Sequence, residues 1–320
     1  MEIVFLGTSA GKPTSERNVS SLALRLEQSS SWALFDCGEA TQHQIMKSPV
    51  SLGKIDEIFI THLHGDHFFG ILGILSTRKM EEIKSRLRIF APKGIEEFLK
   101  TASKISQLDL TGVEITEIEE GKRYFSNSFE VETVKLSHSI ESYAFVVREP
   151  PKSAKLDEEK LKSEGVFPSP IYGELKKGKS VVLQDGRVIN GKNYLLKPQR
   201  GRVVIIAGDN EDPFLLCPFM KEADLLIHEA TYTQEIFDSL KKKQRHTTAK
   251  NLALAAKKCG LKNLIATHIS ARYTFKERRS SKHVSEVENE IKRYFEGVSF
   301  VAKDFDAYRL ERDGKLYKVE

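Results

Sequence analysis

Short, uninterrupted apolar segments that lead into histidine or aspartate are the feature that most constrains the fold of this 320-residue chain. The segments Glu57–Thr61, Arg202–Ala207 and Asn263–Thr267 are rich in isoleucine, valine and leucine, and their apolar residues follow one another directly. Continuous apolar runs of this length are typical of strands that are covered on both faces. We therefore expect an α/β fold with two layers of sheet and helices on the outside, not an all-β sandwich.

The expected elements are spread along the whole chain. Strands are predicted at Glu2–Leu6, Ser21–Leu26, Trp32–Asp36, Glu57–Thr61, Phe129–Leu136, Tyr143–Val147, Arg202–Ala207, Asp224–His228, Asn263–Thr267, Ser299–Ala302 and Ala307–Leu310. Helices are predicted at Phe68–Met80, Thr248–Cys259 and Ser285–Tyr294. The second of these has apolar residues at helical spacing and a following glycine, Gly260, as its stop signal.

Composition places the chain among ordinary globular proteins, with 40% hydrophobic and 30% charged residues. No run approaches the roughly 18 apolar residues of a membrane span, and the sequence opens directly on a strand pattern. We therefore expect a cytoplasmic protein without a membrane segment. The three cysteines, Cys37, Cys217 and Cys259, stand far apart in sequence. Their spacing favours buried reduced thiols over a disulfide or a cysteine metal site.

One segment differs from the rest in charge and in composition. Between Lys152 and Arg202, twelve Lys and Arg face six Asp and Glu, while the whole chain carries +5, which leaves about −1 for the remainder. Proline and glycine punctuate this stretch, and Val181–Ile189 has a hairpin pattern with Asp-Gly at its turn. We expect an arm at about 151–200 inserted in a single domain, 1–320. Its charge suits a polyanion, although a solvated surface loop has the same composition.

The densest group of chemically active residues is Thr61–His67, directly after the strand that ends near Ile60. It holds His62, His64, Asp66 and His67 within six positions. Imidazole and carboxylate are costly to bury without partners, so such a cluster does not serve as core filler. Neutral imidazole suits Zn²⁺ and a carboxylate completes such a site, so the loop predicts a metal centre.

Further histidines and acids share one topological position, at or just beyond the carboxyl ends of apolar strands. They are His138, Asp209, His228 with Glu229, and His268. Layered α/β folds build their active sites at these strand ends. His246, just before a predicted helix, completes the set, whereas His43 and His283 have no such setting and are interpreted as ordinary helix or surface residues.

The order His-x-His-x-Asp-His, followed by His, Asp and His, resembles the metallo-β-lactamase superfamily. Longer motifs resemble, more narrowly, the ribonuclease Z family. They are Phe5-Leu6-Gly7-Thr8, the loop from Pro13 to Arg17-Asn18, His228-Glu229-Ala230-Thr231, His246-Thr247-Thr248-Ala249, and Thr267-His268-Ile269-Ser270-Ala271-Arg272-Tyr273. The resemblance covers essentially the whole chain, and these later motifs are far more specific than the metal signature.

The resemblance implies an αββα sandwich of two mixed sheets with an inserted flexible arm. It also implies a zinc-dependent endoribonuclease that removes the 3′ trailer of precursor tRNA and leaves a tRNA 3′-hydroxyl and a trailer 5′-phosphate. One zinc would be held by His62, His64, His138 and the bridging Asp209, and the second by Asp66, His67, Asp209 and His268. Asp66 would orient the attacking water and accept its proton, while Glu229 and His246 would supply the proton to the leaving oxygen.

The partners implied are precursor tRNA and a second copy of the chain, with one subunit's arm holding tRNA for the other's active site, and no organic cofactor. Expected RNA contacts are Lys176, Lys177 and Lys179 near the tip of the arm, together with Arg17, Asn18 and Arg272. Ser15 stands where the family often has lysine, which puts discrimination against tRNA ending in CCA in doubt. Asn210 stands where threonine is common.

Two other interpretations are weighed against this one. Another hydrolase of the same fold, such as a small-molecule phosphodiesterase or thioesterase, would share the metal ligands but would not need the basic arm or the pair Glu229 and His246. An inactive RNA-binding scaffold would be expected to have lost ligands, and every one of them is present.

Overall fold

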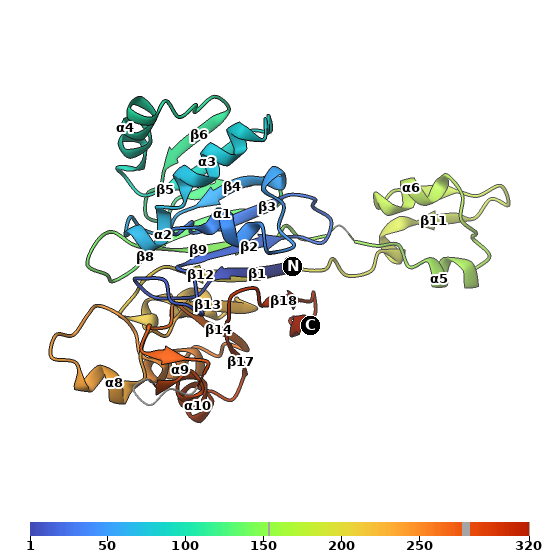
Figure 1. Ribbon diagram of the computed structural model, residues 1–320. Coiled ribbons are helices and arrows are strands. Elements are labelled where there is room, and N and C mark those ends of the chain that lie inside the picture. The colour runs from blue at the N-terminus through green and yellow to red at the C-terminus, as the bar shows by residue number, and fades with distance from the viewer. Residues whose placement is uncertain (153, 277–281, 320) are drawn as a thin grey trace. The chain divides into compact units, whose positions relative to one another are not determined.

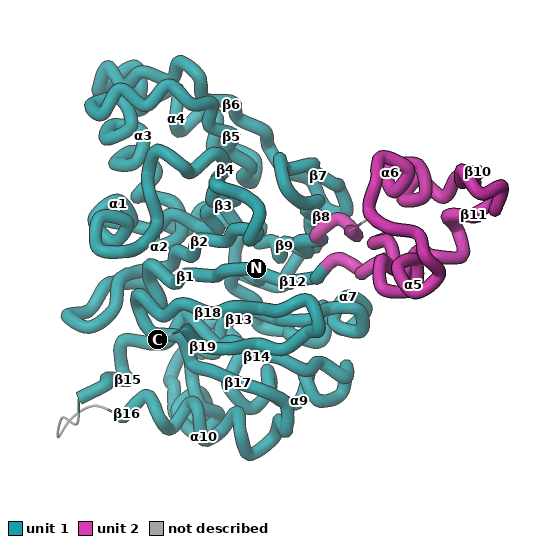
Figure 2. The backbone as a smooth tube through the Cα atoms, turned by 90° about the vertical axis from the view of Figure 1, so that its right-hand side faces the viewer, with its two compact units in different colours: residues 1–148, 202–320 teal, residues 149–201 magenta. Residues whose placement is uncertain are grey.

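The computed structural model describes residues 1–152, 154–276 and 282–319. The chain forms two compact units: Met1–Arg148 together with Arg202–Glu320, and Glu149–Gly201 (Figure 2). The larger unit carries two sheets with helices, and the smaller unit interrupts it in sequence. The insertion therefore begins and ends within two residues of the arm expected from charge and composition.

The first sheet of the larger unit has eight strands in the order β19-β18-β1-β2-β3-β4-β5-β6. Strands β3 to β6 run parallel, while β1, β2, β18 and β19 pair antiparallel. The bounds are β1 Glu2–Gly7, β2 Ser21–Arg25, β3 Trp32–Phe35, β4 Ile55–Phe59, β5 Leu87–Ala91, β6 Val113–Glu117, β18 Ala307–Leu310 and β19 Leu316–Val319.

The second sheet has seven strands in the order β17-β14-β13-β12-β9-β8-β7. Strands β12, β13, β14 and β17 run parallel, and β9 joins them antiparallel to β12. The bounds are β7 Arg123–Phe125, β8 Glu130–Lys135, β9 Tyr143–Arg148, β12 Val203–Ala207, β13 Leu225–Glu229, β14 Asn263–Thr267 and β17 Val298–Val301. A short separate pair, β15 Tyr273–Thr274 and β16 Lys282–His283, lies outside both sheets.

Three apolar clusters define the layers of the larger unit (Figure 1). The cluster between the sheets includes Phe35, Phe59 and Phe145, whose rings contact one another. A second cluster packs α1 (Thr41–Ile45), α3 (Ile71–Met80) and α4 (Ile95–Ser106) on the first sheet. A third packs α7 (Cys217–Met220), α9 (Ala249–Lys258) and α10 (Ser285–Tyr294) on the second. The expected αββα sandwich is thus confirmed.

Most expected elements match to within one or two residues, and the differences have local causes. The single helix expected at Phe68–Met80 is wrong: the chain forms α2 (Gly65–Phe68) and then α3, with Gly70 between them. A Cβ on Gly70 would lie 2.0 Å from the carbonyl oxygen of Gly38, so this close approach admits only glycine. The sequence pattern misses several further elements, among them strands β5, β6, β7 and β19 and helix α4.

The smaller unit, residues 149–201, has a hydrophobic core of its own. It contains α5 (Glu158–Ser163), α6 (Ile171–Lys176), a hairpin of β10 (Ser180–Val182) and β11 (Val188–Asn190), and a 3₁₀ turn, Gly191–Tyr194. The expected hairpin is confirmed, with Val181 opposite Ile189. The core is formed by Leu161, Val166, Leu175, Ile189 and Tyr194. The arm is therefore a small packed unit and not an extended loop.

The expectation of three reduced cysteines is wrong for two of them. Cys217, at the start of α7, and Cys259, at the end of α9, form a disulfide with a Cα–Cα distance of 5.3 Å. Forty-two positions separate them in sequence, so only the packing of α7 against α9 brings them together. Cys37 is a buried free thiol, as expected. Among the described residues, no helix has both the length and the apolar character needed to cross a membrane.

The separate core of unit 149–201 leads to the first prediction. Leu175 is fully buried there, and Leu175→Ala removes contacts worth about 2–5 kcal/mol at such a site. Hydrogen exchange should therefore accelerate at least about 30-fold in amides such as those of Val166 and Ile189, while the sheet amides of β9 and β12 keep their rates. The exposed Leu196 supplies the control, Leu196→Ala. Equal acceleration in β9 and β12 would contradict a separate core.

Candidate metal centre and proton-donor pair

Seven side chains from separate parts of the larger unit converge at the carboxyl ends of its central strands. His62, His64, Asp66 and His67 lie between the end of β4 and α2, as the sequence predicts. His138 follows β8, Asp209 follows β12 and His268 follows β14. The structure thus brings together the complete set of expected metal ligands. They fall in two groups whose donor atoms lie within 4.8 Å of one another, and His246 forms a third such group with Asp209 and His268.

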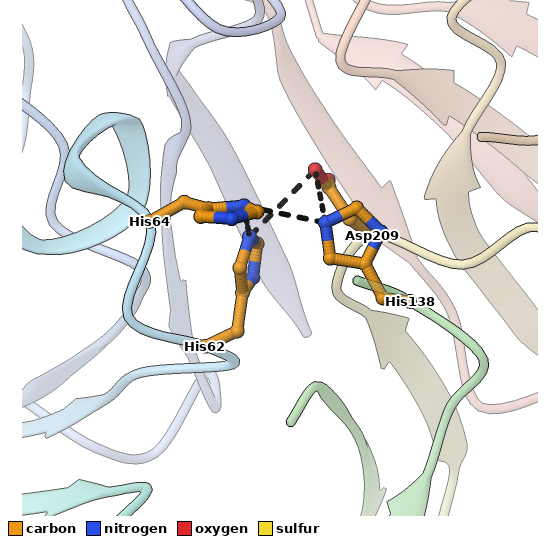
Figure 3. Close-up of side chains that lie close together, drawn as sticks. All are labelled: His62, His64, His138 and Asp209. Carbon is orange, nitrogen blue, oxygen red and sulfur yellow. Dashed lines mark hydrogen bonds and ion pairs between the residues drawn. The ribbon is translucent and has the colours of Figure 1, made fainter. Parts of the chain in front are cut away.

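The first group is His62, His64, His138 and Asp209 (Figure 3). The Nδ1 atom of His64 lies 3.2 Å from the Nε2 atoms of both His62 and His138. Oδ2 of Asp209 lies 3.7 Å from each of those two Nε2 atoms. Three ring nitrogens and one carboxylate oxygen therefore face a common point, which is the donor set of a tetrahedral zinc site.

The second group is Asp66, His67 and His268, and it shares Asp209 with the first. Nε2 of His268 lies 3.3 Å from Nε2 of His67 and 3.3 Å from Oδ2 of Asp66. Oδ1 of Asp209 lies 3.4 Å from His67 Nε2 and 3.4 Å from His268 Nδ1. Because its two oxygens face different groups, the Asp209 carboxylate stands between two adjacent positions for a cation.

Hydrogen bonds fix which ring nitrogen three of the histidines present. Nδ1 of His67 donates to Oδ2 of Asp36 at 2.6 Å, and Nδ1 of His138 donates to the carbonyl oxygen of Arg245 at 2.9 Å. Nδ1 of His62 lies 3.0 Å from the hydroxyl of Thr61, which itself donates to Asp36. With the proton on Nδ1, the Nε2 atom of each of these three rings is free to bind a cation. Hydrogen bonds from the far ring nitrogen orient histidine ligands at metal sites in this way.

The charges at this site suit a divalent cation. Burial would raise the pKa of Asp209, but the neighbouring His268 and His67 hold it well below its usual range, so the group is a carboxylate. Burial, reinforced by the neighbouring imidazoles, lowers the pKa of His62 well below its usual value, which favours the neutral ring. Oδ1 of Asp209 is buried and accepts no hydrogen bond from any described residue. A buried anion without a donor is costly, and a bound cation offsets that cost.

Glu229 and His246 form a second functional element beside Asp209. Nδ1 of His246 lies 3.0 Å from Oε2 and 3.1 Å from Oε1 of Glu229. Burial would lower the pKa of His246, but the Glu229 carboxylate raises it to about 9, so the ring is protonated at neutral pH. Glu229 is buried, while the His246 side chain remains 14% exposed. His246 is therefore the member of the pair that can reach a substrate.

The structure also shows how Glu229 is held. Its Oε1 accepts from the backbone N–H of Asn210 at 2.7 Å, and its Oε2 accepts from the hydroxyl of Thr231. His228 is not part of either ligand group. Its Nδ1 donates to the carbonyl oxygen of Glu229, and its Nε2 accepts from the Asn210 amide at 3.1 Å. Burial lowers the pKa of His228, in keeping with this neutral, supporting role.

The expected RNA contacts differ in accessibility. Arg17 is buried, and its Nη2 donates to the carbonyl oxygens of Ser270 and Tyr273. The expectation that Arg17 contacts RNA conflicts with this burial, because the guanidinium joins two loops below the surface. Asn18 is half-buried and donates to the carbonyl oxygen of Glu39. Arg272 is exposed beside the ring of Tyr232.

Two residues at the site were missed by sequence reasoning. Asp36 binds both His67 and Thr61, and its place at the end of a predicted strand was a usable signal. Gly11 donates its backbone N–H to Oδ2 of Asp66 at 2.8 Å. No sequence pattern indicates that contact, because Gly11 and the start of α2 lie 55 positions apart in the chain.

Comparison with known proteins gives relatives along the full length of the chain. A family model described as Anti-Pycsar protein Apyc1 matches residues 1–157. Ribonuclease Z of Bacillus velezensis is 41% identical over 98% of this chain and 100% of its own length. Ribonuclease Z of Pediococcus pentosaceus is 43% identical over 96% of this chain and 98% of its own.

Solved structures show the same architecture. Human tRNase Z, short form (ELAC1), superposes with a TM-score of 0.65 at 28% identity, over 97% of this chain and 100% of its own. The metallo-β-lactamase fold protein YhfI from Bacillus subtilis has a TM-score of 0.65 at 18% identity, over 96% of this chain and 98% of its own. The second likeness shows the fold alone.

The Asp36–His67 hydrogen bond leads to the second prediction. Asp36→Asn should weaken metal binding about 10–100-fold, because His67, an expected ligand, loses the carboxylate that orients it. Asp36 has φ +58°, a backbone conformation that asparagine tolerates, so the change does not strain the chain. Competition with a chromogenic chelator measures the affinity, and Asp313→Asn on an exposed turn is the control. Equal affinities in all three proteins would show that Asp36 does not orient the ligand.

Proposed function

Since this chain belongs to the ribonuclease Z family, we propose that its seven-ligand cluster and the pair of Glu229 and His246 divide the work of one phosphodiester cleavage. The chain is a tRNA 3′-processing endoribonuclease, in keeping with relatives that match it along their full length and with the tRNase Z neighbour. The observation that carries the division of roles is the placement of His246, 3.0 Å from Glu229, beside the cluster of expected metal ligands.

We propose that the cluster holds two zinc ions. Five of the seven donor side chains are imidazole rings, and zinc prefers imidazole over the all-oxygen sets typical of magnesium. His62, His64, His138 and Asp209 would hold the first ion, and Asp66, His67, His268 and Asp209 the second. When bound, such a pair makes water a stronger nucleophile near neutral pH and offsets charge on the phosphodiester.

The protein's own groups then handle the protons. The pKa of the Asp66 carboxyl lies below its usual range. Burial would raise this pKa, but the hydrogen bond with His268 and the charge of His67 lower it by more. As a carboxylate at the edge of the cluster, Asp66 orients the attacking water and accepts its proton. His246, kept protonated by Glu229, donates a proton to the leaving 3′ oxygen. The products are a tRNA with a 3′-hydroxyl and a trailer with a 5′-phosphate.

The arm is proposed to hold the substrate away from the cleavage point. It contains an open groove of about 900 Å³, lined by Lys155, Lys162 and Lys176, by Tyr172, and also by the acids Asp157, Glu158 and Glu159. Lys177 and Lys179 both pair with Glu174 on the exposed surface. Exposed ion pairs of this kind contribute little to stability, so the lysines can exchange Glu174 for a phosphate at small cost. The basic excess of the arm thus suits recognition of the tRNA backbone by charge and shape.

We propose that the enzyme works in the cytoplasm as a homodimer, as the family resemblance implies, and that it needs no organic cofactor. A general phosphodiesterase of the same fold would use the same cluster on small substrates, so substrate choice separates the two functions.

The role of Asp66 leads to the third prediction. Asp66→Ala removes a proposed ligand and the proton acceptor, so cleavage of precursor tRNA should fall at least about 10³-fold. Metal analysis should show fewer ions per chain, while tRNA affinity, measured by gel shift, should stay within about threefold. Asp304 lies outside the cluster, bonded to Thr8 and Asn18, and Asp304→Asn is the control. Unchanged turnover in Asp66→Ala would refute the mechanism.

Deletion of the arm gives the fourth prediction. Arg148 and Val203 are direct partners on antiparallel strands β9 and β12, so a short turn can replace the intervening segment. Deleting Lys152–Lys197 should lower kcat/KM for precursor tRNA at least about 100-fold, through lost phosphate contacts. Hydrolysis of a small chromogenic phosphodiester should stay within about twofold, because its site lies in the other unit. Equal losses on both substrates would argue against a role in tRNA binding.

A further inference from the structure

A strongly basic loop leads directly into His246. Residues Leu240–Thr248 join α8 (Gln234–Ser239) to α9 (Figure 1). The first part of this segment, the loop Leu240–Arg245, carries Lys241, Lys242, Lys243 and Arg245. All of Lys241–Arg245 is exposed. Within the described parts of the chain, Lys241 and Lys242 have no acidic partner, and Lys243 only approaches Asp238, at 3.9 Å with both side chains 60% exposed. Three adjacent, solvated lysines repel one another, and a polyanion relieves that repulsion.

Arg245 fixes the base of this loop to the metal cluster. Its Nη1 donates to the carbonyl oxygen of His138 at 2.7 Å, and Nδ1 of His138 donates back to the carbonyl oxygen of Arg245 at 2.9 Å. Nε and Nη2 of Arg245 also donate to Oε1 of Glu211, and Nη2 donates to the hydroxyl of Ser137. The loop is thus bonded to a proposed metal ligand on one side and continuous with the proposed proton donor on the other.

Aromatic residues connect the lysines with a second exposed cation. The hydroxyl of Tyr232 donates to Oε1 of Gln244 at 2.8 Å, and the guanidinium of Arg272 lies 5.9 Å from the Tyr232 ring centroid. The ring of Phe237 lies 6.2 Å from that of Tyr232, and Nζ of Lys243 lies 5.2 Å from the Phe237 centroid. The lysine loop and Arg272 therefore border the same part of the surface, on either side of a buried tyrosine.

The reaction indicates which part of the substrate this surface meets. Cleavage that leaves a tRNA 3′-hydroxyl makes the 3′ oxygen of the last tRNA nucleotide the leaving group. The group that protonates this oxygen must lie on the tRNA side of the scissile phosphate, not on the trailer side. Lys243 is three residues from His246, so their Cα atoms are at most about 11 Å apart. The lysines are then within reach of the phosphates that precede the cut.

We propose that Lys241, Lys242 and Lys243, with Arg272, form a phosphate-binding rim that holds the tRNA backbone on the leaving-group side of the active site. This inference rests on the proposed function, because it takes the proton-donor role of His246 as given. Arg245 acts as a positioning residue, since it ties the rim to His138. Lysine contacts to phosphate release counterions, so the rim contributes affinity that falls as salt rises.

The test compares two triple variants of the full-length enzyme. One is Lys241→Gln, Lys242→Gln, Lys243→Gln. The control is Lys257→Gln, Lys258→Gln, Lys262→Gln, which removes the same charge from exposed positions at and just beyond the other end of α9. That ten-residue helix is about 15 Å long. Each enzyme is assayed on precursor tRNA over a range of salt concentrations and on a small chromogenic phosphodiester.

If the rim binds the tRNA backbone, the variant of Lys241, Lys242 and Lys243 should lose about 10–100-fold in kcat/KM for precursor tRNA, mainly through a higher KM. Its plot of log kcat/KM against log salt should become shallower by about 1 or more. Hydrolysis of the small phosphodiester and the activity of the control should stay within about twofold of wild type. If the wild type cleaves precursor tRNA but this variant keeps the wild-type KM and the wild-type slope of log kcat/KM against log salt, the proposed rim is wrong and the proposed function stands.

Substrates with two trailer lengths test the assigned side. The fold loss in the first variant should be the same for a two-nucleotide trailer as for a long one, because the contacts lie on the tRNA. If the loss disappears with the short trailer, the lysines contact the trailer. The proposed contact with the leaving-group side would then be wrong. A wild-type enzyme that hydrolyses only the small phosphodiester overturns the proposed function itself.

Discussion

The buried carboxylate of Asp209 is the constraint on which the rest of the site depends. It lies between two groups of imidazoles, and one of its oxygens is buried without a hydrogen-bond donor among the described residues. A charge in this position is tolerated only where opposite charge surrounds it. The fold meets that need by ending β4, β8, β12 and β14 around one point, so that His62, His138 and His268 reach Asp209 from different strands.

The hydrogen bonds outside the cluster serve the same arrangement. Asp36 orients His67, the carbonyl oxygen of Arg245 orients His138, and both leave Nε2 facing the centre. His268 adopts φ +53°, an uncommon conformation for a residue with a side chain, and is held there by backbone bonds between Ile269 and Thr8 and Ala10. The packed sandwich thus supplies rigidity that isolated loops bearing these ligands would lack.

Sequence alone predicted the apolar strands and the convergence of histidines and acids at their ends, because both follow from local pattern. Apolar runs such as Val203–Ala207 report burial directly, and a histidine after such a run is placed by topology. The rest depends on contacts between distant segments. The break at Gly70 depends on the carbonyl oxygen of Gly38, and the Cys217–Cys259 disulfide depends on how α7 packs on α9. Arg17 looked like an RNA contact by motif, yet its burial depends on the segment Ser270–Tyr273, more than 250 positions along the chain.

The central claim is that a metal-loaded cluster and a protonated His246 together make one cut at the 3′ end of the tRNA. The most direct measurement is to map both product ends of a 3′-extended precursor tRNA, with chelator, without it, and after zinc is restored. The account predicts a single cut beside the discriminator nucleotide, leaving a 3′-hydroxyl and a 5′-phosphate, lost with chelator and recovered with zinc. Cleavage that resists the chelator, or a product with a 2′,3′-cyclic phosphate, would contradict it.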